Sequence, residues 1–171
     1  LDAGAAGVIV PLVNSPDDAA RAVAATRYPL HGIRSYGPMR SLLRIGPTPA
    51  DADATVACLA MIETPDGLAT VEKICATPGL TGVYVGPSDL TLAVGGAYPG
   101  DPAVRDVFEA ALRRIREAAA AAGVAAGMHT AAGADAARRL AEGFTFATIS
   151  SDLTHLERAA ADHLRDSGAE R

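Results

Sequence analysis

The segment "VACLAMIETPDG" (residues 56–67) decides the fold, because it joins a strand, a turn and a helix start within twelve residues. An apolar run typical of a buried strand stops at Glu63, and Thr64 and Pro65 follow in the order that begins a helix. The segment "LTGVYVGPSDL" (80–90) repeats this order and ends its own strand just before Asp89. The two segments predict two buried strands, each followed by a carboxylate.

The same alternation extends in both directions along the chain. The run "GVIVPLV" (7–13) precedes a helix that begins at Ser15 and Pro16, and a weaker strand at 124–129 precedes a helix that stops at Gly143. A last strand at 144–150 leads into a helix that reaches about residue 165. Five strand–helix units predict one domain over residues 1–171, with a parallel sheet covered by helices.

Two arrangements of such a sheet are open, a (β/α)₈ barrel and a doubly wound open sheet. The open sheet usually has a glycine-rich turn after its first strand, whereas this chain has "VPLVNSPDD" (10–18) there. Residues 65–76 and 102–122 are predicted as helices. The stretch 29–49, rich in proline and glycine, is predicted as a long loop after a strand, which in a barrel would help to build the active-site face.

Composition excludes several classes of protein. The net charge of −5 and the pI of about 5.3 leave no basic face, so nucleic acid is not an expected partner. No apolar stretch reaches the roughly 20 residues that span a bilayer, and the first residues do not resemble a signal peptide. Two cysteines, Cys58 in a strand core and Cys75 on a helix face, are too few for a disulfide framework. A location in the cytoplasm is expected.

Glu63 and Asp89 follow consecutive strands, and neighbouring parallel strands end at one edge of a sheet about 4.8 Å apart. Two carboxylates there repel each other, and Mg²⁺ or Mn²⁺, which prefer oxygen ligands, would remove the conflict. The alternative is that both side chains cap the following helices, near Thr64 and Ser88. The turn "GPSD" (86–89) offers free N–H groups to a substrate carboxylate, or is an ordinary helix start.

Five motifs together resemble the HpcH/HpaI aldolase/citrate lyase family, and they cover nearly the whole chain. They are "LDAGAAGVIVPLV", "ATRYPLHGIRSYGPMR", "MIETPDGL", "GVYVGPSDLTLAVG" and "ISSDLTHL". The resemblance is strongest to the metal-dependent (class II) pyruvate aldolases, which cleave 4-hydroxy-2-oxo acids into pyruvate and an aldehyde. It implies a (β/α)₈ barrel of the phosphoenolpyruvate/pyruvate group, assembled as a homohexamer with exchanged C-terminal helices.

The resemblance also implies a binding site for a divalent cation and a 2-oxo acid. It places Mg²⁺, Mn²⁺ or Co²⁺ on Glu63 and Asp89, and the substrate carboxylate on the N–H groups of Ser88 and Asp89. Gly86 and Pro87 would shape the turn that presents these groups.

Three further residues acquire roles from the resemblance alone. Asp2 matches the acid that pairs with the family's catalytic histidine. Tyr36 falls where the family lines the aldehyde pocket, and His129 falls at the rim of that pocket. Arg34 and Arg40 are loop arginines, predicted to form ion pairs at the surface or at an interface.

The chain departs from the family pattern at two points. Met61 stands where the family usually has glutamine. In addition, the family's catalytic histidine, in a "DxEH" segment, and its enolate-stabilising arginine precede "LDAG", so this chain is expected to cover about strands 4 to 8 of a barrel that usually needs about 250 residues.

An incomplete barrel is expected to keep the metal and the 2-oxo acid site, with little turnover. Its open sheet edges predict self-association or cover by a partner chain. Two alternatives stay open, a CoA-thioester lyase of the citrate lyase β-subunit or malyl-CoA lyase type, and a non-catalytic truncated paralogue.

Overall fold

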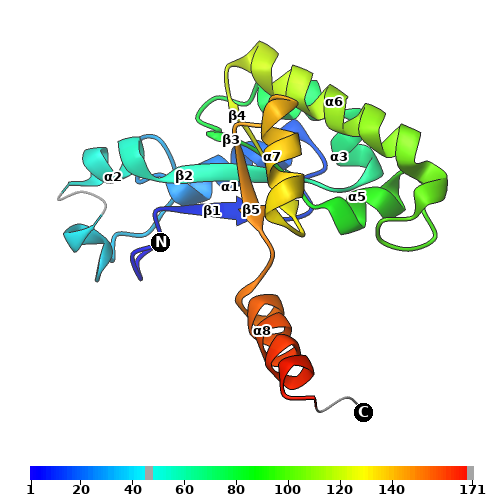
Figure 1. Ribbon diagram of the computed structural model, residues 1–171. Coiled ribbons are helices and arrows are strands. Elements are labelled where there is room, and N and C mark those ends of the chain that lie inside the picture. The colour runs from blue at the N-terminus through cyan, green and yellow to red at the C-terminus, as the bar shows by residue number, and fades with distance from the viewer. Residues whose placement is uncertain (45–47, 169–171) are drawn as a thin grey trace.

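A computed structural model describes residues 1–44 and 48–168 and contains five parallel strands. The strands are β1 (Gly7–Val10), β2 (Ala57–Ile62), β3 (Gly82–Val85), β4 (Ala125–Thr130) and β5 (Phe146–Ile149). Their order in the sheet is the order in the chain, β1-β2-β3-β4-β5. A doubly wound sheet reverses its strand order at a switch point, whereas a barrel does not. The structure therefore confirms part of a (β/α)₈ barrel and excludes the open sheet (Figure 1).

Helices connect the strands, and most begin where the sequence predicts. The helical elements are α1 (Pro16–Thr26), η1 (Ser41–Leu43), α2 (Pro49–Thr55), α3 (Pro65–Ala69), α4 (Val71–Cys75), α5 (Pro87–Ala93), η2 (Pro102–Val104), α6 (Arg105–Ala122), α7 (Gly133–Ala141) and α8 (Asp152–Asp166). Ser15 and Ser151 cap α1 and α8, because each side chain accepts a hydrogen bond from an N–H in the first turn. Asp101 caps η2 in the same way.

One predicted helix, 65–76, is broken into α3 and α4 at Thr70. The backbone of Thr70 leaves the helical region, with φ −114° and ψ 14°. Its hydroxyl donates hydrogen bonds to the carbonyl oxygens of Asp66 and Asn14, each at 3.0 Å. The bond to Asn14 ties the break to the segment that follows β1.

The prediction that 29–49 is a loop after a strand is wrong. The described part of this stretch follows helix α1 and leads through η1 and α2 into β2, so it lies at the amino end of the sheet; residues 45–47 lie outside the described residues. The chain folds back on the end of α1, where the Ile33 N–H donates to the Ala24 carbonyl at 2.8 Å. Gly32 permits this return, because a Cβ there would lie 2.3 Å from the Ala24 oxygen.

The two faces of the sheet differ in their cover. Cys58, Ala60 and Ile62 of β2 point to the helices and are fully buried in the main core. Leu59 and Met61 point to the other face and are half-buried. Helix α1 packs on β2, and α6 and α7 pack on β3, β4 and β5. The half-covered face corresponds to the interior of the barrel, so the site must be sought at its carboxyl edge.

Helix α8 runs away from the sheet (Figure 1). None of its described residues is buried, and Leu153, Leu156 and Leu164 are each more than half exposed. Among the described residues, no helix has the length and apolar character required to cross a bilayer.

Candidate functional site

Four residues form a row across the carboxyl edge of the sheet. The register pairs Ile62 of β2 with Val85 of β3, and Val85 with Met128 of β4. The next residue along each strand direction is Glu63, Gly86 and His129, respectively, so these three residues lie side by side. Thr148 of β5 pairs with His129 and extends the row. The predicted metal, turn and pocket-rim residues therefore come from adjacent strands and lie at the same edge.

Glu63 is held at this edge by the backbone of the first unit. Its carboxylate is buried, with 5% of the residue exposed, and Oε1 accepts a hydrogen bond of 2.8 Å from the Leu12 N–H. Leu12 has a φ of +55°, a conformation that L-residues rarely adopt, and this local strain accompanies its contact with Glu63. On the other side, a Cβ on Gly86 would lie 2.6 Å from Oε2, so a larger residue there would displace the carboxylate.

Asp89 lies in the first turn of α5, and its side chain is exposed. Within the described chain neither Glu63 nor Asp89 forms an ion pair, and Asp89 accepts no side-chain hydrogen bond. Two carboxylates at the ends of adjacent strands, without a cation of the protein, fit a divalent cation that prefers oxygen ligands. No cluster of three or more candidate metal-binding side chains occurs in the described residues.

The turn before α5 presents backbone donors next to these carboxylates. Gly86 is the N-cap residue but offers no side chain, so the first N–H groups of the helix, including those of Ser88 and Asp89, are free of intrahelical partners. Pro87 occupies the first helical position, and its carbonyl accepts a hydrogen bond of 2.7 Å from the Thr91 hydroxyl. The turn can therefore bind a carboxylate through its backbone.

His129 is oriented by two residues that sequence reasoning missed. Its Nδ1 lies 3.2 Å from the Thr148 hydroxyl, which in turn lies 2.5 Å from the hydroxyl of buried Tyr84. Tyr84 also stacks on Phe146, with ring centroids 6.0 Å apart. The alternation in "FTFATIS" would have shown that Phe146 and Thr148 share one face, but the partner on β3 depends on the sheet register.

Asp2 and Tyr36 lie at the opposite, amino end of the sheet. Asp2 precedes β1, and its Oδ1 accepts a hydrogen bond of 2.5 Å from Nη2 of Arg34. Arg34 stacks over Tyr28 at 4.6 Å, and the Tyr36 ring lies 5.7 Å from the Tyr28 ring. The six residues of β2 separate this group from Glu63 by about 20 Å. The predicted site residues of one chain therefore fall into two groups, which lie at opposite ends of the sheet.

Arg34 forms an ion pair, as predicted, and its partner is Asp2, but the pair does not place Arg34 at the surface of the chain, since only 7% of Arg34 is exposed. The loop after α1 folds over the guanidinium, and Tyr28 and Asp2 replace the water that it loses. The two cysteines lie in the core as predicted, and burial raises the pKa of the Cys75 thiol to about 11. Neither thiol is suited to nucleophilic chemistry.

Comparison with known proteins agrees with the geometry. The profile of the HpcH/HpaI aldolase/citrate lyase family matches residues 1–159, and the chain belongs to this family. The hydroxypyruvate/pyruvate aldolase of Rhizorhabdus wittichii is 42% identical over 170 residues, which cover 99% of this chain and 67% of that protein. The 5-keto-4-deoxy-D-glucarate aldolase of Salmonella paratyphi C is 36% identical over 169 residues, which cover 97% of this chain and 64% of that protein.

A solved structure supports the same assignment. A HpcH/HpaI aldolase/citrate lyase family protein from Burkholderia cenocepacia superposes with a TM-score of 0.83 and 34% identity, over 97% of this chain and 66% of that chain. The chain therefore spans about two thirds of the length of these relatives, as an incomplete barrel requires.

Proposed function

We propose that the protein acts as a carbon–carbon lyase, which cleaves a 4-hydroxy-2-oxo acid into pyruvate and an aldehyde with the help of a divalent cation. The observation that carries the proposal is the buried carboxylate of Glu63, which within the described part of the chain has one backbone donor and no cationic side chain paired with it. The names of the relatives, a hydroxypyruvate/pyruvate aldolase and a 5-keto-4-deoxy-D-glucarate aldolase, support this class over a lyase of CoA thioesters.

Different residues at the carboxyl edge bind the cation and the substrate. Glu63 and Asp89 would hold the cation, with Mg²⁺, Mn²⁺ and Co²⁺ as candidates; when bound, it supplies Lewis-acid polarisation of the 2-oxo group. The N–H groups of Ser88 and Asp89 hold the substrate carboxylate, and Gly86 and Pro87 set the path of the turn. His129 contacts the aldehyde half at the rim.

The proton of the 4-hydroxyl group of the substrate needs an acceptor. Asp2, which the family resemblance assigns to the catalytic acid–base pair, lies about 20 Å away and contacts Arg34. We infer that a second copy of the chain brings Asp2 and Tyr36 to the carboxyl edge. We therefore propose a homo-oligomer, of which the family hexamer is the expected form, and the exposed leucines of α8 supply an apolar face for it.

The expected partner and the expected location both follow from composition. The substrate is a small 2-oxo acid, and neither nucleic acid nor membrane is an expected partner for a chain of charge −5 without a membrane-spanning helix among its described residues. The cytoplasm stays the predicted location.

The test measures binding and turnover separately. Isothermal titration of the metal-free protein with Mn²⁺, and of the Mg²⁺-loaded protein with pyruvate, reports the site even where turnover is slow. Release of pyruvate from 4-hydroxy-2-oxopentanoate, coupled to lactate dehydrogenase, reports the reaction. Glu63→Gln keeps the hydrogen bond from Leu12 and removes the charge, so we expect loss of Mn²⁺ binding without loss of folding.

The matched control is Glu117→Gln, on the exposed face of α6. Equal Mn²⁺ affinity of Glu63→Gln and the wild type would overturn the proposed metal site. Cleavage of malyl-CoA in preference to the small 4-hydroxy-2-oxo acid would assign the protein to the CoA-thioester branch instead.

A further inference from the structure

The segment that follows β1 is joined to the segment that follows β2 beyond the point where the two strands pair. Their parallel ladder ends with the pair Val10 and Ala60, and Pro11 has no N–H group with which to continue it. The next residue, Leu12, donates its N–H to Oε1 of Glu63 at 2.8 Å. Contacts other than the ladder must therefore set the position of this donor.

The conformation of Leu12 is not explained by its own side chain. The residue is 61% exposed, and its φ of +55° is one that residues with a Cβ rarely adopt. Such a conformation persists where the surrounding contacts determine it. The residue after it is held tightly, since Val13 is 2% exposed and a Cβ on Gly67 would lie 2.5 Å from the Val13 carbonyl oxygen. The backbone that follows Leu12 thus restrains it.

Asn14 connects this backbone to the start of α3 and to the break between α3 and α4. Its Oδ1 accepts a hydrogen bond of 2.5 Å from the hydroxyl of Thr64, the residue next to Glu63. Its carbonyl oxygen accepts a hydrogen bond of 3.0 Å from the hydroxyl of Thr70. The hydroxyl of Thr64 also caps α3. Asn14 therefore fixes the distance between the two segments close to Glu63.

Asn14 is fixed to α1 as well. Its N–H donates to Oδ2 of Asp18 at 3.1 Å, and the Ser15 hydroxyl donates to the same oxygen at 2.8 Å. Asp18 lies in the first turn of α1, and this helix packs on β2. Because Asn14 is bound to a helix on each side, Leu12, two residues earlier, has little freedom to move.

We propose that Asn14 is a positioning residue of the proposed metal site. It holds Leu12 in its strained conformation, and through the Leu12 N–H it orients the carboxylate of Glu63. The inference rests on the proposed function, in which Glu63 is a ligand of the cation. Asn14 itself touches neither the cation nor the substrate. Residues that orient a metal ligand in this way typically contribute about 10–100-fold to metal affinity.

Two readouts test the proposal, and one of them needs no metal. In the metal-free protein, hydrogen exchange followed by NMR is expected to show a protected Leu12 N–H, and Asn14→Ala should speed its exchange at least about tenfold. Titration with Mn²⁺ should give an affinity about 10–100-fold lower for Asn14→Ala than for the wild type. Adding Leu12→Gly to Asn14→Ala should recover most of this affinity, because glycine adopts a φ of +55° without strain.

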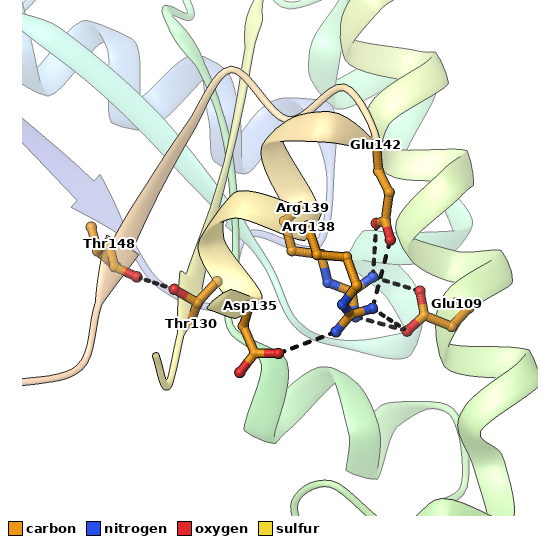
Figure 2. Close-up of polar contacts among 7 residues, drawn as sticks. All are labelled: Glu109, Thr130, Asp135, Arg138, Arg139, Glu142 and Thr148. Carbon is orange, nitrogen blue, oxygen red and sulfur yellow. Dashed lines mark hydrogen bonds and ion pairs between the residues drawn. The ribbon is translucent and has the colours of Figure 1, made fainter. Parts of the chain in front are cut away.

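A second variant and a matched control complete the design. Thr70→Val removes the other contact of Asn14 and nearly keeps the shape of the side chain, so it should have a smaller effect in the same direction. The control is Thr130→Val. Figure 2 shows the Thr130 hydroxyl donating to the Thr148 carbonyl, at 2.8 Å, which joins β4 to β5 at the same edge of the sheet but two strands away from β2. Circular dichroism verifies that each variant folds.

The outcomes separate this inference from the proposed function. If either readout of Asn14→Ala equals that of Thr130→Val, the positioning role is wrong while the proposed function stands. A loss of affinity that Leu12→Gly does not recover reflects general destabilisation and also overturns the role. If Asn14→Ala does not fold, the same comparison is made with Thr70→Val. If the wild type does not bind Mn²⁺, the metal site of the proposed function is wrong, and the positioning role is overturned with it.

Discussion

A single methyl group at Gly86 is predicted to disable the proposed metal site without unfolding the protein. The Cβ of Gly86→Ala would lie 2.6 Å from Oε2 of Glu63 and 3.2 Å from the sulfur of Met61. The backbone of Gly86 has φ −88° and ψ 97°, which alanine adopts without strain. The whole effect of the substitution therefore acts through the carboxylate of Glu63 and the thioether beside it.

The size of the effect follows from the distances. A carbon and an oxygen need about 3.4 Å, so the carboxylate must withdraw by roughly 0.8 Å. Oε1 is held by the Leu12 N–H at 2.8 Å, and the side chain cannot retreat without weakening that bond. Metal–ligand distances tolerate only about 0.2 Å, so the affinity for Mn²⁺ should fall at least about tenfold. Overpacking at one methyl group should cost about 1–3 kcal/mol of stability.

Titration with Mn²⁺, followed by calorimetry, measures the affinity, and urea unfolding measures the stability. Gly133→Ala is the matched control, because a Cβ at that exposed position meets nothing within 4 Å and the glycine has no positive φ. If Gly86→Ala binds Mn²⁺ as tightly as Gly133→Ala does, Glu63 is not a metal ligand in the conformation described.

Three further substitutions test the packing that positions the site. Gly127→Ala would place a Cβ 2.0 Å from the Phe146 ring, so the free energy of unfolding should fall by about 1–3 kcal/mol. An unchanged midpoint of urea unfolding would contradict the described packing of β4 on β5. Arg34→Met should cost about 1–3 kcal/mol and speed hydrogen exchange in the loop after α1, because it removes a buried guanidinium from Tyr28. Arg139 holds the pKa of Glu109 below its usual 4.5, so this pair stabilises the fold above about pH 4.5 and less as pH falls. Arg139→Met should therefore cost about 2 kcal/mol at pH 7 and flatten the loss of stability between about pH 5 and pH 3, and an unchanged pH profile would refute the pairing.

The carboxyl edge of the sheet could be predicted from the sequence because local rules determine it. The apolar run before Glu63, the proline after Thr64 and the proline after Gly86 fix where each strand ends and each helix begins. Side-by-side strands then follow from the short helical connection, which is α3 and α4 between β2 and β3, and these two strands are neighbours as predicted.

The amino end could not be predicted in this way, because its structure depends on contacts between distant segments. Arg34 is buried only because Tyr28 and Asp2, which lie 6 and 32 residues away in the chain, meet at its guanidinium. The backbone donor to Glu63 is equally non-local, since Leu12 is 51 residues earlier and nothing in "VIVPLV" marks it as a hydrogen-bond donor. Hydrophobic periodicity contains no information on either contact.

The separation between the two ends of the sheet explains why one chain does not bring all of the proposed site residues together. The two ends of each parallel strand lie at opposite faces of a barrel. Residues that precede β1 and residues that follow β2 therefore cannot approach each other through a rearrangement of loops alone. Asp2 is therefore tied to Arg34, whereas Glu63 is tied to Leu12. The thioether of Met61 lies near Gly86 and near Oε2 of Glu63, and it cannot donate a hydrogen bond to that oxygen. The proposed function assigns this oxygen to a divalent cation, and it assigns the groups of the amino end to a second copy of the chain.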